Sequence, residues 1–559
     1  MKVKECTVPD FFKGGNTFEV PVFQRRYAWK EKHFRMLWED ILTVTDGIKK
    51  RHFMGTVIFE SFKKGSGIFV IDGQQRLATF TILLKALECA AKNNDLSAKP
   101  SIPKMLTINR RGRFLPSLPD RGAFEHLLDN PKLLKRSTHK NVHSAYTYFY
   151  AEIDNYLKNT TGQKPAKFSK LFSAITEKMI FVELELSGED DAHSIFETIN
   201  YAGVPLTPAD LARNLVLGMA KRKDSPEELN EKYWQPLERR LEDNVNLASK
   251  RARKAELQKV LPELIRTYLI VKKRKYISAS DTFSEFRNHC KKESLERILD
   301  ELAKTSIHFC KFLNPENENS KQIRKHLYNF VDLRMTTHYP LLIVLYSAME
   351  ERKINATELA CSMQYIESFV VRRAFNSKVS RDLSQVFADI AGKLIAQTGK
   401  GSKYISAFKG LLAEKKWPSD DDFSACFLSS PIYTTAPAFA RYTLTTIEKK
   451  NTASHEELSF GKDIQIEHVF PQQSKQGDWG ISEIPDLKKH LHVIGNLTLT
   501  SKNQALKNDS FDVKKRIYKT SPYWITRESI ANNQKWTGNS IQKRSSLLLR
   551  EALKIWPGL

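Results

Sequence analysis

From roughly Ser225 to Lys415 the chain is a long run of amphipathic helical patterns, with no repeat period and no long flexible linker. Apolar residues recur at the three- and four-residue spacing of helices that bury one face. At 559 residues the chain also exceeds what one hydrophobic core usually organises. We therefore expect a mostly helical α+β protein of several domains, in which residues 225–415 form a helical connector between domains at 1–224 and 416–559.

The boundary before the last domain is placed at Trp417–Asp422, which reads WPSDDD. Proline, serine and successive aspartates are typical of a turn between packed elements. Within the connector, basic residues gather at Lys250–Lys254, Lys272–Lys275 and Arg372–Arg373. We predict that the first two clusters contact nucleic-acid phosphates.

The overall charge favours a polyanionic partner. Lys and Arg together number 89 against 64 Asp and Glu, which gives a net charge of +25. Such an excess fits nucleic acid or an anionic membrane surface, and charge alone does not choose between them. With 41% hydrophobic and 27% charged residues, the composition excludes wholesale disorder.

The sequence has no pattern typical of a membrane-spanning segment or of a cysteine redox motif. The N-terminus has no apolar h-region, and the longest apolar stretch, near Tyr339 to Met349, is too short to span a bilayer. Six cysteines are scattered singly, without a CxxC pair for zinc or redox chemistry. We expect a cytoplasmic protein with reduced cysteines and no membrane partner.

The N-terminal third begins with a predicted hairpin. His52–Asp72 has two β-rich runs around a Lys-Lys-Gly-Ser-Gly turn, and helically spaced apolar residues follow Gly73. Asp72–Arg76 should therefore occupy a strand-to-helix turn, where backbone N–H groups favour an anion.

Further along, Met179–Leu186 reads as a strand and Asp190–Asn200 as a short helix closed by Gly203. Thr207–Asp210 has a capping residue, a proline at the first helical position and an acid three residues after the cap. A helix should therefore continue from Leu211 onward.

In the C-terminal region the sequence pattern changes from helical to strand-like. Asp463–Phe470 and His492–Thr500 read as strands, and a polar helical stretch runs through Tyr518. Strand, loop, strand, helix is the ββα-metal arrangement used by HNH nucleases.

Four residues in this arrangement carry the candidate chemistry. A neutral His suits proton abstraction from water near pH 7, so His468 is the candidate base. Glu467 and the side-chain carbonyl of Asn503 could supply the oxygen ligands that Mg²⁺ prefers. Asn496 would tie the loop between the strands to the strand backbone.

A simpler interpretation makes Glu467-His468 an exposed strand end and the asparagines turn formers. Adjacent residues on a strand also face opposite sides, so Glu467 and His468 share a site only at a bulge or a strand end. His490 and His492 are rival metal or phosphate ligands, of which His492 is expected to pack instead.

The C-terminal motifs EHVFPQ, HVIGNLTLTSKNQALKN and FDVKKRIY resemble the HNH domain of GmrSD-type modification-dependent (type IV) restriction endonucleases. The resemblance covers about residues 423–559 and extends to Trp536-Thr537, Ile541 and Arg544 near the terminal helix. It implies that His468, Glu467, Asn496 and Asn503 form a catalytic site with Mg²⁺ or Mn²⁺.

Three N-terminal segments resemble the GmrS-type domain, which is related to the ParB/sulfiredoxin fold. They are Pro21–Trp29, Asp72–Arg76 and His193–Asn214. The resemblance implies binding of a nucleoside triphosphate (NTP), with NTPase activity, by Gln24, Arg25, Asp72, Gly73, Gln74, Gln75, Arg76, Asn200 and Asp210. On physical grounds, Gly73 lets the backbone approach a phosphate and Arg76 can grip one.

Simpler interpretations exist for each of these residues. DGQQR can be an ordinary turn and helix start, and Asp210 can serve only the capping box. Tyr27 and Trp29 are hydrophobic anchors or faces for base stacking. Arg110–Arg113 is a solvated loop or a phosphate clamp.

These observations predict an NTP-regulated, metal-dependent DNA endonuclease of bacterial anti-phage defence that cleaves modified foreign DNA. Two alternatives stay open. One is a nucleotide-gated DNA-binding regulator with a degenerate HNH fold, and the other is an HNH nuclease that acts on RNA. The state of assembly is also open, with a homo-oligomer as one option.

Overall fold

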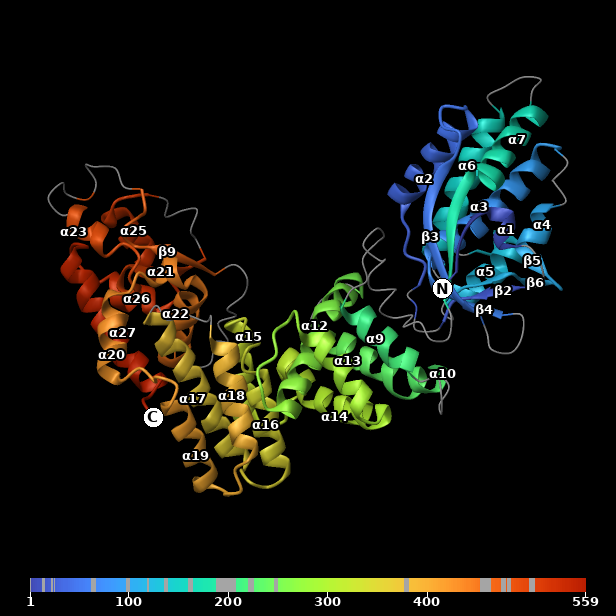
Figure 1. Cartoon of the computed structure of the whole chain (residues 1–559). Coiled ribbons are helices and arrows are strands. Elements are labelled where there is room, and N and C mark those ends of the chain that lie inside the picture. Colours follow the sequence, from blue (N-terminus) through green and yellow to red (C-terminus); the bar gives the residue numbers. More distant parts are fainter. Residues whose placement is uncertain are drawn as a thin grey trace. The chain divides into compact units, whose positions relative to one another are not determined.

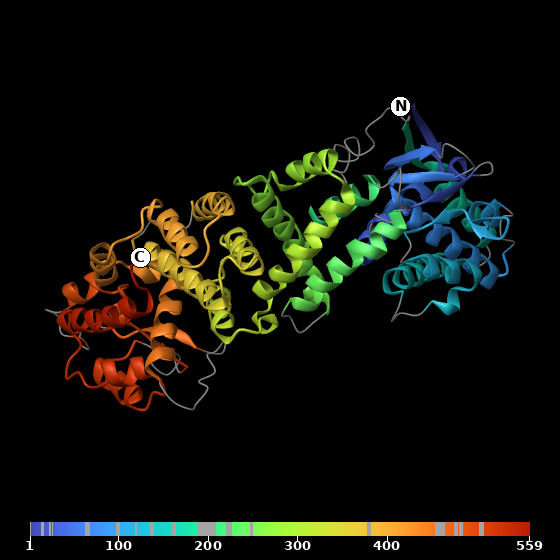
Figure 2. The same cartoon turned by 90° about the horizontal axis from the view of Figure 1, so that it is seen from below.

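The computed structural model describes residues 2–12, 16–21, 24, 26–61, 67–96, 101–117, 120–134, 139–158, 164–186, 208–219, 226–245, 250–376, 382–452, 464–473, 479, 484–501 and 508–559. The chain folds as two compact units, unit 1 at Met1–Pro236 and unit 2 at Leu237–Leu559 (Figures 1 and 2). The fold class is α+β and mostly helical, as predicted. No helix within the described ranges is long and apolar enough to cross a membrane.

Unit 1 is built on a mixed six-stranded sheet of order β1-β8-β3-β4-β2-β7. Its strands are β1 (Lys2–Thr7), β2 (Thr17–Glu19), β3 (His52–Ser61), β4 (Gly67–Asp72), β7 (Phe114–Leu115) and β8 (Met179–Leu186). The pairs β1–β8 and β3–β4 are antiparallel, and β8–β3, β4–β2 and β2–β7 are parallel. The predicted hairpin at 52–72 and the predicted strand at 179–186 are confirmed.

Helices up to α7 lie around this sheet (Figure 1). The helices of unit 1 are α1 (Val8–Phe11), α2 (Glu31–Thr45), α3 (Gln74–Asn93), α4 (Ser101–Leu106), α5 (Arg121–Asp129), α6 (Lys140–Lys158), α7 (Lys164–Ser173), α9 (Pro208–Met219) and α10 (Pro226–Leu229). A small ladder joins β5 (Thr107–Ile108) to β6 (Arg111–Gly112). The helix predicted from Leu211 is α9, whereas the one predicted at 190–200 lies outside the described residues.

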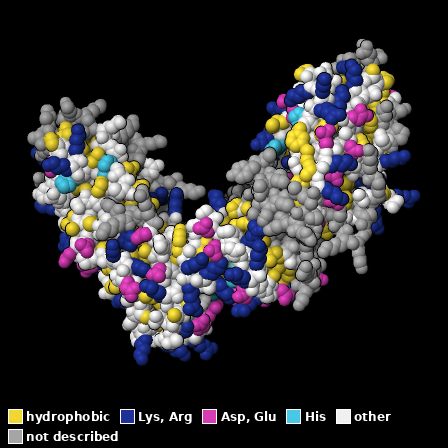
Figure 3. Space-filling model, viewed as in Figure 1, with side chains coloured by type: hydrophobic (Ala, Val, Ile, Leu, Met, Phe, Trp, Pro, Cys, Tyr) yellow, Lys and Arg dark blue, Asp and Glu magenta, His cyan; other side chains and the backbone are white. Residues whose placement is uncertain are grey.

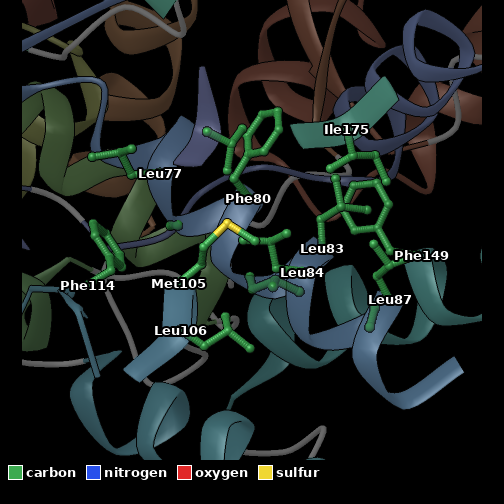
Figure 4. Close-up of a cluster of buried hydrophobic side chains, with 14 of the residues drawn as sticks. Leu77, Phe80, Leu83, Leu84, Leu87, Met105, Leu106, Phe114, Phe149 and Ile175 are labelled. Atoms are coloured by element: carbon green, nitrogen blue, oxygen red, sulfur yellow. The ribbon is translucent and has the colours of Figure 1, made fainter. Parts of the chain in front are cut away.

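The centre of unit 1 is α3, which is buried along nearly all of its length. Figure 4 shows Leu83, Leu84 and Leu87 of this helix among Leu106 and Phe149 from neighbouring helices. Because α3 starts directly after β4, its burial fixes the turn between them. The predicted strand-to-helix position of Asp72–Arg76 is thereby confirmed.

The predicted helical run is confirmed in unit 2. Its helices before the last region are α11 (Gln235–Asn244, which begins at the end of unit 1), α12 (Lys250–Lys273), α13 (Thr282–Lys292), α14 (Leu295–Leu313), α15 (Lys321–Asp332), α16 (Tyr339–Glu350), α17 (Ala356–Phe375), α18 (Leu383–Ile395), α19 (Ser402–Ala413), α20 (Asp420–Ser429), α21 (Ile432–Thr435) and α22 (Pro437–Asn451). The apolar stretch at 339–349 forms α16, which packs against α12, α14, α17 and α18. It is a core helix rather than a membrane segment.

The last region holds an antiparallel strand pair, β9 (Gln465–His468) and β10 (Leu497–Thr500). Its helices are α23 (Ile484–Lys489), α25 (Phe511–Lys519), α26 (Trp524–Ile530) and α27 (Gly538–Ile555). The order of strand, strand and helix is as predicted. Both strands are shorter than predicted, and a 3₁₀ turn at Ile494–Asn496 replaces the start of the second one.

The basic pair Arg372–Arg373 is not a surface cluster. Arg372 is fully buried, and its guanidinium donates to Trp556 O at 2.8 and 3.1 Å, to Pro418 O at 3.1 Å and to Asp420 at 2.6 Å. Arg373 pairs with Asp382 at 2.7 Å. Both side chains therefore serve packing within unit 2.

The predicted boundary at residues 417–422 is where α20 begins. Ser419 accepts a hydrogen bond from Asp422 N at 3.1 Å and donates to the Asp422 carboxylate at 2.8 Å, which forms a capping box. Residues 237–415 and 416–559 lie in the same compact unit. The division into three domains stays a prediction.

Three of the four cations in the cluster Lys272–Lys275 are paired with two acids. Lys272 pairs with Glu301 at 2.7 Å, and Glu285 pairs with Lys273 and, at 2.8 Å, with Lys275. The two lysines lower the pKa of Glu285 to about 2. Figure 3 likewise shows Lys and Arg interspersed with Asp and Glu on one face of the molecule. The side chains of 250–254 lie outside the described residues.

Candidate active site

The strand pair β9–β10 places the predicted nuclease residues. His468 pairs with Leu497 and Glu467 with Thr498, and the register is regular through Thr500 and Gln465. Neighbouring side chains of such a strand point to opposite faces. Glu467 and His468, which ends β9, accordingly have different side-chain partners, Lys514 for Glu467 and His492 for His468.

Asn496 fastens the loop that precedes β10. Its Nδ2 donates to Phe470 O at 3.0 Å and to Leu491 O at 2.9 Å. Its Oδ1 accepts from Phe470 N at 2.9 Å and from Trp536 Nε1 at 3.1 Å. The fully buried amide thus holds the chain directly after His468, which is the geometry expected of a supporting residue.

His468 sits in a pocket of aromatic and imidazole groups, with 6% of the residue exposed. Its Nε2 lies 3.2 Å from Nδ1 of His492, and its Nδ1 lies 3.5 Å from Nε2 of Gln472. The Tyr433 ring meets His468 edge-on at 4.4 Å and stacks on His492 at 5.8 Å.

The environment keeps His468 neutral. Burial lowers its pKa to about 4, and His492 and Lys514 act in the same direction. A histidine must be neutral to accept a proton from water. The protonation state of His468 at pH 7 therefore suits a general base.

Glu467 lies in a buried ion pair. It is 7% exposed, and Lys514 of α25 donates to its Oε1 and, at 2.9 Å, to His468 O. Burial raises the pKa of Glu467 and lowers that of Lys514, and each partner opposes the other's shift. Lys514 is itself fully buried, so the pair links α25 to β9.

The described residues do not build a Mg²⁺ site. The carboxylate expected as a ligand already has an ammonium partner, and Asn503 lies outside the described residues. Within the described ranges no cluster of three His, Cys, Asp or Glu side chains could hold a metal ion. We derive no catalytic step through a metal ion.

One interpretation of this region was wrong. The exposed strand end fails because Glu467 and His468 are both buried. His492 packs against the Tyr433 ring, as expected, and its Nδ1 also contacts the candidate base. His490 lies near Asp486 and Gln542, at 3.8 and 3.4 Å.

The closeness of His492 to His468 could have been predicted from the sequence. Antiparallel pairing brings the residues before β10 alongside the residues after β9, and Val469 N bonds Asn496 O at 2.9 Å. His492 lies in that same approach to β10. Lys514 had no comparable signal, because it lies 47 positions from Glu467 and on another element.

The second candidate site is the turn between β4 and α3. Gly73 has φ of +91°, and a Cβ there would lie 2.9 Å from a methyl group of Val57. The bonds Arg76 N to Gly73 O and Leu77 N to Gly73 O, both 3.0 Å, begin α3. The amides of Gln74 and Gln75 precede these bonds, so they are placed for an anion.

Arg76 lies across the neighbouring strand β3. Its guanidinium donates to Thr56 O and approaches Asp72 at 3.8 Å. An ideal Cβ on Gly55, which has φ of +99°, would lie 3.1 Å from the guanidinium carbon. The absence of a side chain at Gly55 thus makes room for Arg76.

Two of the three glutamines in the N-terminal motifs, Gln24 and Gln75, hold loops. Gln75 accepts from Ala28 N at 2.7 Å and donates to Arg26 O at 3.2 Å, while Gln24 donates to Ile71 O at 2.8 Å. The structure therefore brings the Pro21–Trp29 segment and the Asp72–Arg76 turn together. Their carboxamides are engaged with the main chain.

The remaining candidates divide between packing and undescribed positions. Tyr27 is buried and bonds Thr79 at 2.8 Å, which makes it an anchor and not a stacking face. Arg113 is buried and donates to Lys104 O at 2.7 Å, so it belongs to no exposed clamp. Asp210 lies in the first turn of α9. Arg25 and Asn200 lie outside the described residues.

Two family comparisons match the sequence, one at each end. Residues 8–217 match the N-terminal domain of GmrSD restriction endonucleases, and residues 417–551 match their C-terminal domain. The class of protein that these matches define is a restriction endonuclease, for which DNA is the substrate. The chain belongs to the GmrSD family. A comparison with curated proteins gave no match.

Proposed function

We propose that the protein hydrolyses phosphodiester bonds of DNA at an HNH-type site, with His468 as the general base. The observation that carries this proposal is a neutral, buried His468 at the end of β9, next to the loop that Asn496 fastens. His468 would take a proton from the water that attacks phosphorus. The family supports the further proposal that the substrate is modified foreign DNA, cleaved in anti-phage defence.

We propose that unit 1 binds an NTP at the turn Asp72–Arg76 and hydrolyses it, on a ParB/sulfiredoxin-like core. Three features support this site: the left-handed Gly73, the amides at the start of α3 and the nearby Arg76 guanidinium. Occupancy or hydrolysis of the nucleotide would control DNA cleavage.

The requirement for Mg²⁺ or Mn²⁺ rests on the family resemblance. In an HNH site such an ion neutralises charge that develops on the scissile phosphate. The pairing of Glu467 with Lys514 favours the alternative of a DNA-binding regulator with a degenerate site. Chelation by EDTA followed by readdition of Mg²⁺ or Mn²⁺ decides between these two possibilities.

One experiment tests the function as a whole. Purified protein and its His468→Ala variant are incubated with modified phage DNA, unmodified DNA and matched RNA, with and without Mg²⁺ and each NTP. The proposal expects wild-type cleavage of modified DNA that an NTP changes and that the variant lacks. Binding without cleavage would support the regulator, and cleavage of RNA alone would support the RNA nuclease.

A further inference from the structure

The contact between His468 and His492 has a direction that the surrounding atoms determine. One proton at most lies between Nε2 of His468 and Nδ1 of His492, which are 3.2 Å apart. Either nitrogen can donate, depending on the tautomer. The choice decides which nitrogen of His468 keeps a lone pair for catalysis.

Gln472 favours one of the two directions. Its Nε2 donates, and it lies 3.5 Å from Nδ1 of His468. An acceptor at Nδ1 satisfies this contact, and the proton of His468 is then on Nε2 and points at His492. The opposite tautomer would set the N–H at Nδ1 against the amide N–H of Gln472.

We infer that His492 is a positioning residue, which accepts the Nε2 proton of His468 and so leaves Nδ1 as the atom that takes a proton from water. This inference rests on the proposed nuclease function. The long contact to Gln472 is weak, so the attacking water can replace it without losing a strong bond. In the step itself, an O–H bond of water breaks and its proton binds Nδ1. The water oxygen bonds phosphorus while the P–O bond to the leaving sugar oxygen breaks, and that oxygen takes a proton from solvent water.

The fold holds His492 firmly for this role. Tyr433 donates its backbone N–H to His492 O at 3.3 Å, and its ring lies nearly parallel to the imidazole, at 9°. The same ring contacts His468 edge-on, so the two imidazoles stay almost perpendicular, at 83°. This arrangement directs His492 Nδ1 at its neighbour.

The tautomer can be measured without any nuclease assay. The full-length protein is labelled with ¹⁵N at histidine, and the His468 signals are assigned by their loss in His468→Gln. Long-range ¹H–¹⁵N spectra of the wild type should show His468 protonated at Nε2. A His468 that carries its proton at Nδ1 would overturn the inference, whether or not the protein cuts DNA.

Kinetics supply the second test. His492→Asn keeps an acceptor close to the position of Nδ1 and should retain kcat within a few-fold. His492→Phe keeps the ring but has no acceptor, and it should lower kcat on the order of 10²-fold with KM unchanged. Asp486→Asn, a substitution of an exposed side chain on α23 outside this contact, is the control and should cleave like the wild type.

Equal kcat values for His492→Phe and the wild type would refute the positioning role. If His492→Phe does not fold, the NMR result and the His492→Asn variant still decide the matter. A wild type that cleaves no nucleic acid would count against the proposed function, and the spectra would report the tautomer independently.

Discussion

The two candidate sites are held together by different parts of the chain. In unit 1 the turn at Gly73 depends on backbone geometry, since a left-handed residue and the first amides of α3 create it. In unit 2 the surroundings of His468 depend on side chains, because His492 and Asn496 come from the segment before β10 and Lys514 comes from α25. The backbone site can therefore be predicted from the five consecutive residues Asp72–Arg76. The residues of the side-chain site are far apart in the sequence.

Of the substitutions that test this comparison, one at His468 should have the largest effect, and that effect is on the rate of DNA cleavage. His468→Ala should lower DNA cleavage by roughly 10² to 10⁴, because that is the usual contribution of a general base. The Asn496 network leaves the loop in place, so folding and DNA binding should change little. Single-turnover cleavage and DNA titrations measure the two effects, and activity within a few-fold of wild type would remove His468 from the mechanism.

Lys514 should be the side chain whose loss costs unit 2 the most stability. Lys514→Met leaves the Glu467 carboxylate buried without a partner, a change that typically costs about 3–5 kcal/mol. Urea unfolding measures the loss, and the double variant with Glu467→Gln should recover much of it. Lys519→Met, an exposed position on the same helix, should cost only about 0.5 kcal/mol.

If the Lys514→Met and Lys519→Met variants are equally stable, the ion pair does not support the side-chain site. Urea unfolding in the presence of Mg²⁺ tests whether Glu467 can bind the ion. Stabilisation of Lys514→Met by Mg²⁺ beyond that of the wild type would mean that the freed carboxylate binds the ion.

Arg76 is the one side chain on which the backbone site should depend for binding. Arg76→Ala should weaken NTP binding by about 1.5–3 kcal/mol, the usual loss for a charge-assisted hydrogen bond. Nucleotide titrations of both proteins measure this. If the NTP gates cleavage, modified DNA must in turn change the NTP affinity of the wild type, because coupling between binding sites is reciprocal. Equal affinities with and without DNA would mean uncoupled units.

Among the four positions His468, Lys514, Arg76 and Gly73, substitution of Gly73 should have the smallest effect. That effect is a loss of stability caused by backbone conformation. Gly73→Ala forces a side chain into a left-handed conformation and against Val57, which we expect to cost about 1–3 kcal/mol. Gly47→Ala is a matched control, since Gly47 has φ of +80° with no atom within 4 Å of a Cβ. A Gly73→Ala variant no less stable than Gly47→Ala would show that the close approach is not needed.

The sequence predicted those parts of the fold that local pattern controls. The hairpin at 52–72, α3, α9 and the helices of 225–415 follow from alternation, helical spacing and capping residues. The strands β9 and β10 were predicted too long, because apolar residues after His468 and before Leu497 read as strand while they pack in a loop.

Only the part of the candidate site that depends on local sequence pattern could be predicted. Asn496 beside β9 could be foreseen from neighbouring motifs, whereas the partner of Glu467 could not. Pairing with Lys514 depends on how α25 packs against β9, and an amphipathic pattern does not say which lysine turns inward. The burial of Arg372 could not be foreseen either, since its partners lie 46 and 184 positions away.

The buried Arg372 also makes the segment after α27 part of the support of a distant helix. Its Nε bonds the carbonyl of Trp556, 184 residues later, and nearby Ser368 donates to Pro557 O at 2.6 Å. A chain truncated before residue 555 therefore keeps the Pro418 and Asp420 acceptors of this cation but loses the Trp556 carbonyl, which accepts two of its bonds. The last turn of α17 then gains its full set of bonds only when residues 556 and 557 are in place. Limited proteolysis of purified chains with and without residues 555–559 would reveal this dependence as protection of α17 in the longer chain alone.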